Sequence, residues 1–164
     1  MPAPEGGRGG TPPRPCAAAP GPRQRFIFGP WIFDVTAATG LLRAAPRPAQ
    51  PIPVRQWARA YGLDPAPAAP HTVSLIGPGP GFDPVYAMTT DLDEPVIIAT
   101  LTGPDGTPAG PLLIDGCHRL YKAARLGRGE LPSLVLTAGE TLAIRHDRVL
   151  GPARSRRDRK EAES

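Results

Sequence analysis

Proline and glycine limit how much of this chain can form a folded core. Of its 164 residues, 24 are proline and 19 are glycine, and residues 1–24 are rich in both. Residues 151–164 are mainly polar and charged. Segments of these kinds bury too little apolar surface to offset the entropy lost on ordering. We therefore expect disordered termini at 1–24 and 151–164 around a single domain at 25–150, with one modest core.

The net charge of +4 comes from these expected tails. Residues 25–150 contain 11 Arg or Lys and 11 Asp or Glu, so the domain itself is neutral. Nearly all basic residues are arginine, and Ala, Pro and Gly are abundant, which is the bias of a GC-rich bacterial genome. The charge pattern predicts at most a weak, salt-sensitive contact with DNA through the basic tails.

The two cysteines and the apolar runs indicate the compartment. Cys16 lies in the Pro-rich tail and Cys117 in an apolar segment, so a structural disulfide between them would tie the fold to a disordered segment. The N-terminus has no apolar signal region, and no apolar run approaches the roughly 18 residues of a membrane span. We expect reduced thiols, a cytoplasmic protein and no membrane partner.

Apolar runs separated by turn residues predict more strands than helices. Residues 25–35 are aromatic and β-branched with Gly29-Pro30 in their middle, which predicts one broken strand or a hairpin. Residues 95–103 are apolar enough for a central strand, and 111–115 predict another strand after an Asp-Gly turn. The sequence thus predicts an α+β domain with a mixed sheet and a few short helices.

The remaining segments complete this prediction. We expect a helical turn at 36–44, a strand running into a helix over 51–63, strands at 72–76, 85–88 and 131–137, a helix at 117–126 ended by Gly127, and a last helix at 138–150. Two other features are weak. The "GPGPG" run at 77–81 lacks N–H groups at its prolines, so we interpret it as a stiff loop. His71 has no second metal-ligand type nearby, and we expect it to be solvated.

The stretch "PLLIDGCHR" at 111–119 carries the strongest chemical signal. An apolar strand leads into a turn at Gly116, and the first N–H groups of the following helix have no intrahelical acceptors. The helix dipole adds partial positive charge there, and the side chains of His118 and Arg119 could add donors. This combination is typical of a site that stabilises a phosphate or a thiolate.

Ordinary structural roles remain open for the same residues. Positions 117, 120, 121 and 124 form an apolar stripe, so Cys117 could be an inert core residue. His118 could be solvated and Asp115 merely a helix cap. Against this, a thiol in the first turn would have its pKa lowered by the helix dipole and by Arg119.

The sequence "IDGCHRLYKAARLGRGELPSLVL" resembles the signature of the ParB/sulfiredoxin superfamily. A strand ending in Asp-Gly, a His-Arg pair, a short helix ending near Leu-Gly and a strand after Leu-Pro follow in that order. The likeness covers roughly residues 51–137 and is strongest over 112–136. It implies a small ParB/sulfiredoxin-like domain.

The resemblance implies roles for the residues of the motif. Gly116, Cys117, His118 and Arg119 match the sulfiredoxin motif, in which the cysteine is the nucleophile and the following residues hold the phosphates of ATP with magnesium. Asp115 stands where sulfiredoxins have a second glycine, and Asp-Gly before His-Arg is the usual form in ParB-like nuclease domains. Partition proteins use a Glu-Arg-Arg type continuation for CTP, which is absent here, and a following helix-turn-helix domain, for which about 37 residues leave too little room. We therefore expect no role in chromosome partitioning.

These observations lead to three hypotheses. In the first, a stand-alone ParB-like domain binds a nucleotide or another phosphate-bearing small molecule at residues 115–119. The ligand would be a nucleoside triphosphate, ATP or CTP, with Mg²⁺ held by Asp115, and hydrolysis or phosphoryl transfer could follow. The second is a sulfiredoxin-like, ATP-dependent thiol reductase with Cys117 and Asp115 as catalytic residues. The third is a non-catalytic accessory module that binds DNA or a protein, and a scaffold without any ligand also stays open.

Overall fold

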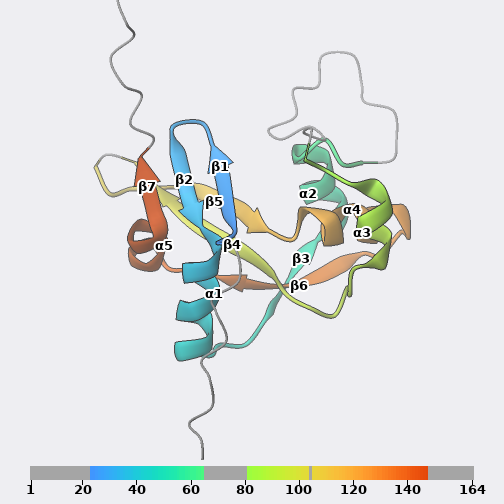
Figure 1. Cartoon of the computed structure of the whole chain (residues 1–164), viewed down its shortest axis with the longest axis horizontal. Helices are drawn as coiled ribbons and strands as arrows, with labels where there is room; N and C mark the ends of the chain where they lie inside the picture. Colours follow the sequence, from blue (N-terminus) through green and yellow to red (C-terminus); the bar gives the residue numbers. More distant parts are fainter. Residues whose placement is uncertain (1–22, 65–80, 104, 148–164) are drawn as a thin grey trace, which may run out of the picture.

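The structure is a computed structural model that describes residues 23–64, 81–103 and 105–147. Its strands form two sheets, and five helices flank them (Figure 1). The helices α2, α3 and α4 lie on one side of the molecule, and α1 and α5 lie on the other. The predicted α+β class is confirmed. Within the described ranges, no helix has the length and apolar character needed to cross a membrane.

The larger sheet carries the centre of the fold. Its strand order is β3 (Gln50–Pro53), β6 (Glu130–Val135), β4 (Val96–Thr102) and β5 (Pro108–Asp115). β4 runs parallel to β6, whereas the β3–β6 and β4–β5 pairs are antiparallel, so the sheet is mixed as predicted. The first four residues of β4 are buried, which fits the central position expected for this strand.

The smaller sheet consists of β1 (Arg25–Phe28), β2 (Trp31–Asp34) and β7 (Arg145–Asp147), in the order β1-β2-β7. β1 and β2 form a hairpin whose turn holds Gly29 at a φ of +55°. This confirms the hairpin alternative for residues 25–35. The helix α1 (Val35–Ala44) follows directly, and the Asp34 side chain caps it by accepting from the N–H of Ala37.

Apolar side chains from both sheets and from the helices form one core. Phe33, Leu113 and Leu120 are completely buried in it. The helix α2 (Val54–Ala60) ends near Tyr61, whose buried hydroxyl accepts from the N–H of Leu113 at 2.7 Å. Because β5 is an edge strand, this bond satisfies an amide that no neighbouring strand can reach.

Two predicted elements are wrong in type or extent. Residues 85–88 form no strand, because they belong to helix α3 (Pro84–Thr89), in which the Asp83 side chain caps two N–H groups and Pro84 opens the first turn. The last helix, α5 (Ala138–Ile144), ends earlier than predicted, and the chain continues as β7. The predicted strand at 72–76, His71 and most of the "GPGPG" run lie outside the described residues, as do nearly all of the expected tails.

Candidate functional site

The turn between β5 and α4 (Cys117–Arg125) has the strand-to-helix form that the sequence predicts. Its single linking residue, Gly116, has a φ of +102°, which L side chains rarely adopt. A Cβ at this position would lie 2.8 Å from the Cβ of Val96, closer than real side-chain contacts. Glycine is therefore required here both by backbone conformation and by the close approach of β4.

The N-terminus of α4 has no side-chain cap. The first backbone N–H to find a helical acceptor is that of Leu120, which bonds to the carbonyl of Gly116. The N–H groups of residues 117–119 consequently have no intrahelical partner. Three uncapped N–H groups and the positive end of the helix dipole together favour a negatively charged ligand.

Asp115 does not act as the helix cap that one interpretation of the sequence gave it. Its Oδ2 accepts from Arg119 Nη2 at 2.7 Å, and its Oδ1 accepts from Gln24 Nε2 at 3.1 Å. The carboxylate thus turns away from the α4 amides and joins two distant parts of the chain. Gln24 was the last residue of the expected tail, and nothing in the local sequence indicated this contact.

Arg119 is held firmly at the same turn. Its side chain is only 12% exposed, and its Nη1 donates to the Pro95 carbonyl at 3.1 Å and lies 3.3 Å from Glu94 Oε2. Together with the bond to Asp115, these contacts engage three of its five N–H donors. The remaining donors have no partner among the described residues.

His118 is fixed by an aromatic cage rather than solvated. Its ring stacks on Phe82 with 4.8 Å between centroids, and Tyr86 meets it edge-on at 5.1 Å. Its Nε2 accepts from the backbone N–H of Asp83 at 3.3 Å. With Nε2 as acceptor, a neutral ring carries its proton on Nδ1, so only that nitrogen can donate to a ligand.

The sequence left two alternatives open for Cys117, an inert core residue and a reactive thiol with a lowered pKa, and the pKa of the thiol fits the first. Burial and the neighbouring charge of Asp115 raise the pKa of this thiol to about 11. The expectation that the helix dipole and Arg119 lower its pKa was wrong, because the side chain packs partly buried against the core and the nearest charge is a carboxylate. At neutral pH the side chain is a thiol and a poor nucleophile.

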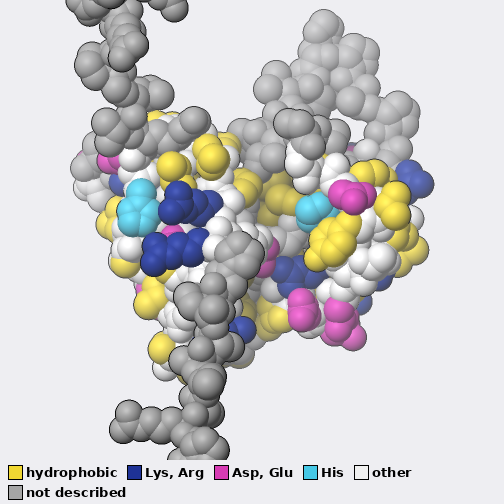
Figure 2. All heavy atoms as spheres, viewed as in Figure 1, with side chains coloured by type: hydrophobic (Ala, Val, Ile, Leu, Met, Phe, Trp, Pro, Cys, Tyr) yellow, Lys and Arg dark blue, Asp and Glu magenta, His cyan; other side chains and the backbone are white. Residues whose placement is uncertain are grey.

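A cleft of about 730 Å³ opens beside this turn. Its walls come from the N-terminal segment, from α3 and the loop after it, and from the β5–α4 turn. Figure 2 shows basic, acidic, hydrophobic and histidine side chains meeting around a recess on this face of the molecule. The cleft is lined by Gln24, Tyr86, Thr89, Thr90, Asp91, Glu94, Asp115, Gly116, His118 and Arg119.

The cleft gathers four of the five predicted site residues and several that sequence reasoning missed. Asp115, Gly116, His118 and Arg119 line it, whereas Cys117 does not. Tyr86 was missed because its segment, 85–88, was assigned to a strand, although the Asp83-Pro84 pair is a helix-start signal that could have identified α3. A hydrogen bond of 2.5 Å from Lys122 Nζ to the Thr90 carbonyl ties the loop after α3 to α4.

The cleft carries more negative than positive side-chain charge. Asp91, Glu94 and Asp115 contribute three carboxylates against the one arginine, so a free phosphate would be repelled. No group of three or more His, Cys, Asp or Glu side chains within the described ranges is placed to hold a metal ion. Magnesium bound together with a phosphate needs only one or two carboxylates, but both oxygens of Asp115 already accept hydrogen bonds from Gln24 and Arg119.

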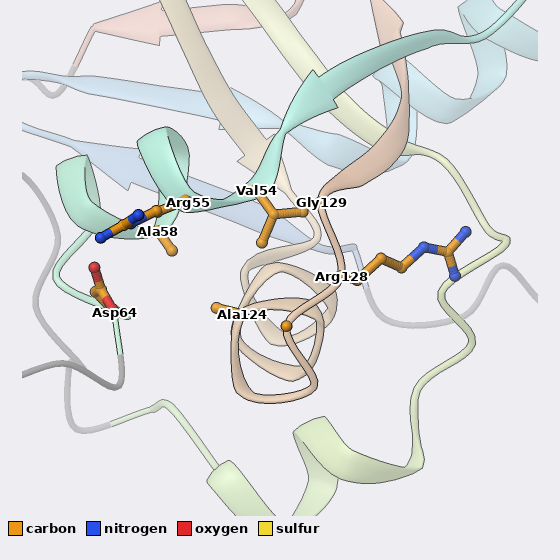
Figure 3. A pocket seen from close by; sticks show the side chains of 8 residues that line it. Val54, Arg55, Ala58, Asp64, Ala124, Arg128 and Gly129 are labelled. Carbon is orange, nitrogen blue, oxygen red and sulfur yellow. The ribbon is translucent and has the colours of Figure 1, made fainter.

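A second pocket, of about 300 Å³, lies between α2 and the end of α4 (Figure 3). Arg55 and Arg128 line it, but their guanidinium groups point away from each other. Arg128 pairs with Asp93, and Asp64 pairs with Arg59. The pocket therefore does not bring its charged groups together on one ligand position.

Comparison with known proteins adds no relative. No family model, curated protein or solved structure matches this chain. The likeness to the ParB/sulfiredoxin superfamily therefore rests on the residues of the motif alone.

Proposed function

We propose that this domain binds a nucleoside triphosphate as its magnesium complex in the cleft at the β5–α4 turn. The observation that carries the proposal is the uncapped N-terminus of α4, which opens into a 730 Å³ cleft beside a nearly buried arginine. The phosphates would lie against the N–H groups of residues 117–119 and the free donors of Arg119.

Two further features favour a nucleotide over inorganic phosphate. The volume of the cleft exceeds what a single phosphate needs, and it lies within the range of small-molecule sites. Tyr86 lines the cleft with 57% of its surface exposed, which offers a ring on which a nucleobase could stack. Thr89 and Asp91 on the same wall could accept or donate hydrogen bonds to the base or the sugar.

We propose binding as the primary function and turnover as a second one. Phosphoryl transfer or hydrolysis would need a carboxylate free to orient the attacking group, and both oxygens of Asp115 already accept hydrogen bonds. Ligand binding would have to displace Gln24 before Asp115 could hold magnesium. The sulfiredoxin-like alternative is disfavoured by a thiol whose pKa is raised to about 11.

Isothermal titration calorimetry with ATP or CTP and Mg²⁺ tests this proposal. We expect one molecule to bind, and we expect Arg119→Gln to weaken binding by about tenfold or more, because it removes charge-assisted hydrogen bonds. Tyr86→Ala should weaken nucleotide binding by about tenfold, because the stacking surface is lost, and it should weaken the binding of inorganic triphosphate less. Arg43→Gln, an exposed change on α1 outside the cleft, is the control for net charge.

Arg119→Gln leaves the Asp115 carboxylate without its main partner, so the fold must be checked separately. The double variant Asp115→Asn/Arg119→Gln removes both charges of the pair and keeps a polar side chain at each position. We expect it to fold, as measured by circular dichroism, and to have lost nucleotide affinity. A folded double variant that binds as tightly as the wild type would show that the turn is not the binding site.

A further inference from the structure

The outer face of the small sheet gathers positive charge. Side chains alternate along β2, so Phe33 enters the core while Ile32 and Asp34 point outward. In the antiparallel register, Arg25 lies opposite Asp34 and His146 lies opposite Ile32, which places all four on that outer face. A shallow pocket of about 230 Å³ there is lined by Arg23, Arg25, Ile32, Asp34 and His146.

The two arginines of this pocket are not neutralised by the fold. Neither Arg23 nor Arg25 makes an ion pair within the described ranges, whereas Arg47, Arg59, Arg119 and Arg128 each pair with a carboxylate there. The one carboxylate of the pocket, Asp34, accepts from the N–H of Ala37 and caps α1. Figure 2 shows basic side chains next to a histidine on the half of the molecule that holds β1, β2 and β7.

The sequence adds charge of the same sign at this sheet. The described residues at both ends of the chain, Arg23 and Asp147, belong to or directly precede its strands. Residues 148–164, which continue from β7, contain six Arg or Lys against three Asp or Glu. Two arginines without an ion-pair partner therefore lie at this sheet, and a basic segment follows its last strand in the sequence.

We propose that this face, defined as Arg23, Arg25 and His146, binds the phosphodiester backbone of a nucleic acid without reading its sequence. Arginine guanidinium groups match phosphate oxygens with two parallel hydrogen bonds, and the pocket has room for a phosphate group. The aromatic side chains of the hairpin lie on its core side, so the outer face offers Ile27 and Ile32 and none of the hairpin's aromatic rings for base stacking. Backbone contacts with a duplex fit this chemistry best.

The site is distinct from the cleft, although the chain connects them. Arg23 and Arg25 line the basic face, while Gln24 between them donates to Asp115 in the cleft. Nucleic-acid binding at the basic face does not depend on a nucleotide in the cleft, so either proposal can fail alone.

Fluorescence anisotropy with a short labelled duplex DNA, and with a duplex RNA of the same sequence, tests the proposal on the full-length chain. We expect Arg23→Gln/Arg25→Gln to weaken binding by about tenfold at about 50 mM salt. The slope of log affinity against log salt should become shallower by about two, because each phosphate contact contributes about 0.9. The matched control Arg43→Gln/Arg55→Gln removes two exposed arginines that make no ion pair among the described residues, and it should change affinity less than about twofold.

Several outcomes would overturn the proposal. The wild type could fail to bind either duplex at low salt. Alternatively, the two double variants could lose affinity equally, which would show that binding depends on net charge and not on this face. Removal of residues 151–164 could abolish binding while Arg23→Gln/Arg25→Gln leaves it intact, which would assign binding to the terminal segment alone. Poly-glutamate could compete as well as DNA, which would indicate an acidic protein partner. Preference for DNA over RNA, or the reverse, would identify which nucleic acid the face recognises.

Discussion

The helices α4 and α5 both begin just after strands of the larger sheet, as the uncapped α2 also does, but the first turns of α4 and α5 differ in how they are capped. The helix α5 follows β6 and has a complete capping box, in which Thr137 accepts from the N–H of Glu140 and Glu140 accepts from the N–H of Thr137. The helix α4 follows β5 and has no cap at all. The α5 start is satisfied by side chains of its own first turn, and the α4 start is not.

An arginine–carboxylate pair accompanies each of these helix starts. Arg47 binds Glu140 through two nitrogens and also donates to the Val135 carbonyl, so this pair reinforces the α5 cap. Arg119 binds Asp115 and thereby draws the carboxylate away from the α4 amides. The same kind of ion pair therefore completes one helix N-terminus and exposes the other, which is why we assign a ligand to α4 and only a structural role to α5.

Gly116→Ala should produce the largest effect, and it tests whether the α4 turn is as constrained as the geometry indicates. The new Cβ would meet Val96 at a residue with φ of +102°, so we expect a loss of about 3 kcal/mol in the free energy of unfolding. Urea denaturation measures this loss. Gly40→Ala in α1 is the control, because a Cβ there meets nothing within 4 Å and should be neutral or slightly stabilising. Equal stabilities of the two variants would mean that the turn tolerates a side chain.

Thr137→Ala tests the other helix start. It removes the hydroxyl that accepts from the Glu140 N–H, so the free energy of unfolding should fall by about 1 kcal/mol. Nucleotide affinity should not change, because the α5 cap does not line the cleft. Thermal denaturation and calorimetric titration of the same sample measure the two quantities. A loss of nucleotide affinity with unchanged stability would contradict the division of roles between α4 and α5.

The smallest effect concerns how the stability contributed by the Arg47–Glu140 ion pair depends on pH. Hydrogen bonds from Arg47 and from the Thr137 backbone lower the pKa of Glu140 from 4.5 to about 2. Because the folded pKa is lower than the unfolded one, the stabilisation is present above about pH 4.5 and is lost as the pH falls towards 2. Between about pH 5 and pH 3, the wild type should lose about 1 kcal/mol more stability than Glu140→Gln.

Glu130→Gln serves as the reference for that measurement, because it removes an exposed carboxylate that makes no ion pair within the described ranges. Its acid denaturation should follow that of the wild type. If the Glu140→Gln and wild-type stabilities fall in parallel with pH, then the Arg47–Glu140 pair does not hold the carboxylate in its charged form.

Local signals predicted the strands and the helix that carry the site. Each of three elements is marked by apolar residues and turn residues that lie within a few positions of one another in the sequence. These elements are the Gly29-Pro30 hairpin, the central strand β4 and the β5–α4 turn. The helix α3 was missed because four apolar residues outweighed the Asp83-Pro84 start signal. A pattern of apolar residues over so short a run does not separate a strand from a helix.

Contacts between distant segments could not be predicted in this way. Gln24 reaches Asp115 across 91 positions, and Arg119 reaches Glu94 across 25. The argument for a lowered pKa of Cys117 was wrong for the same reason. The charge beside the thiol depends on where the fold places the Asp115 carboxylate. The sequence thus indicated which residues lie at the turn, while their partners and protonation states followed only from the fold.

The most direct test of the account is a two-dimensional ¹⁵N–¹H NMR titration of the wild type with Mg²⁺ and ATP, then CTP. We predict that the amide signals of residues 116–119 shift most, together with the side-chain amide of Gln24, while those of Thr137 and Glu140 stay in place. Saturable shifts at α4 would place the nucleotide on the uncapped helix start. Shifts confined to other residues, or none at millimolar nucleotide, would contradict the central claim that this turn is a phosphate site.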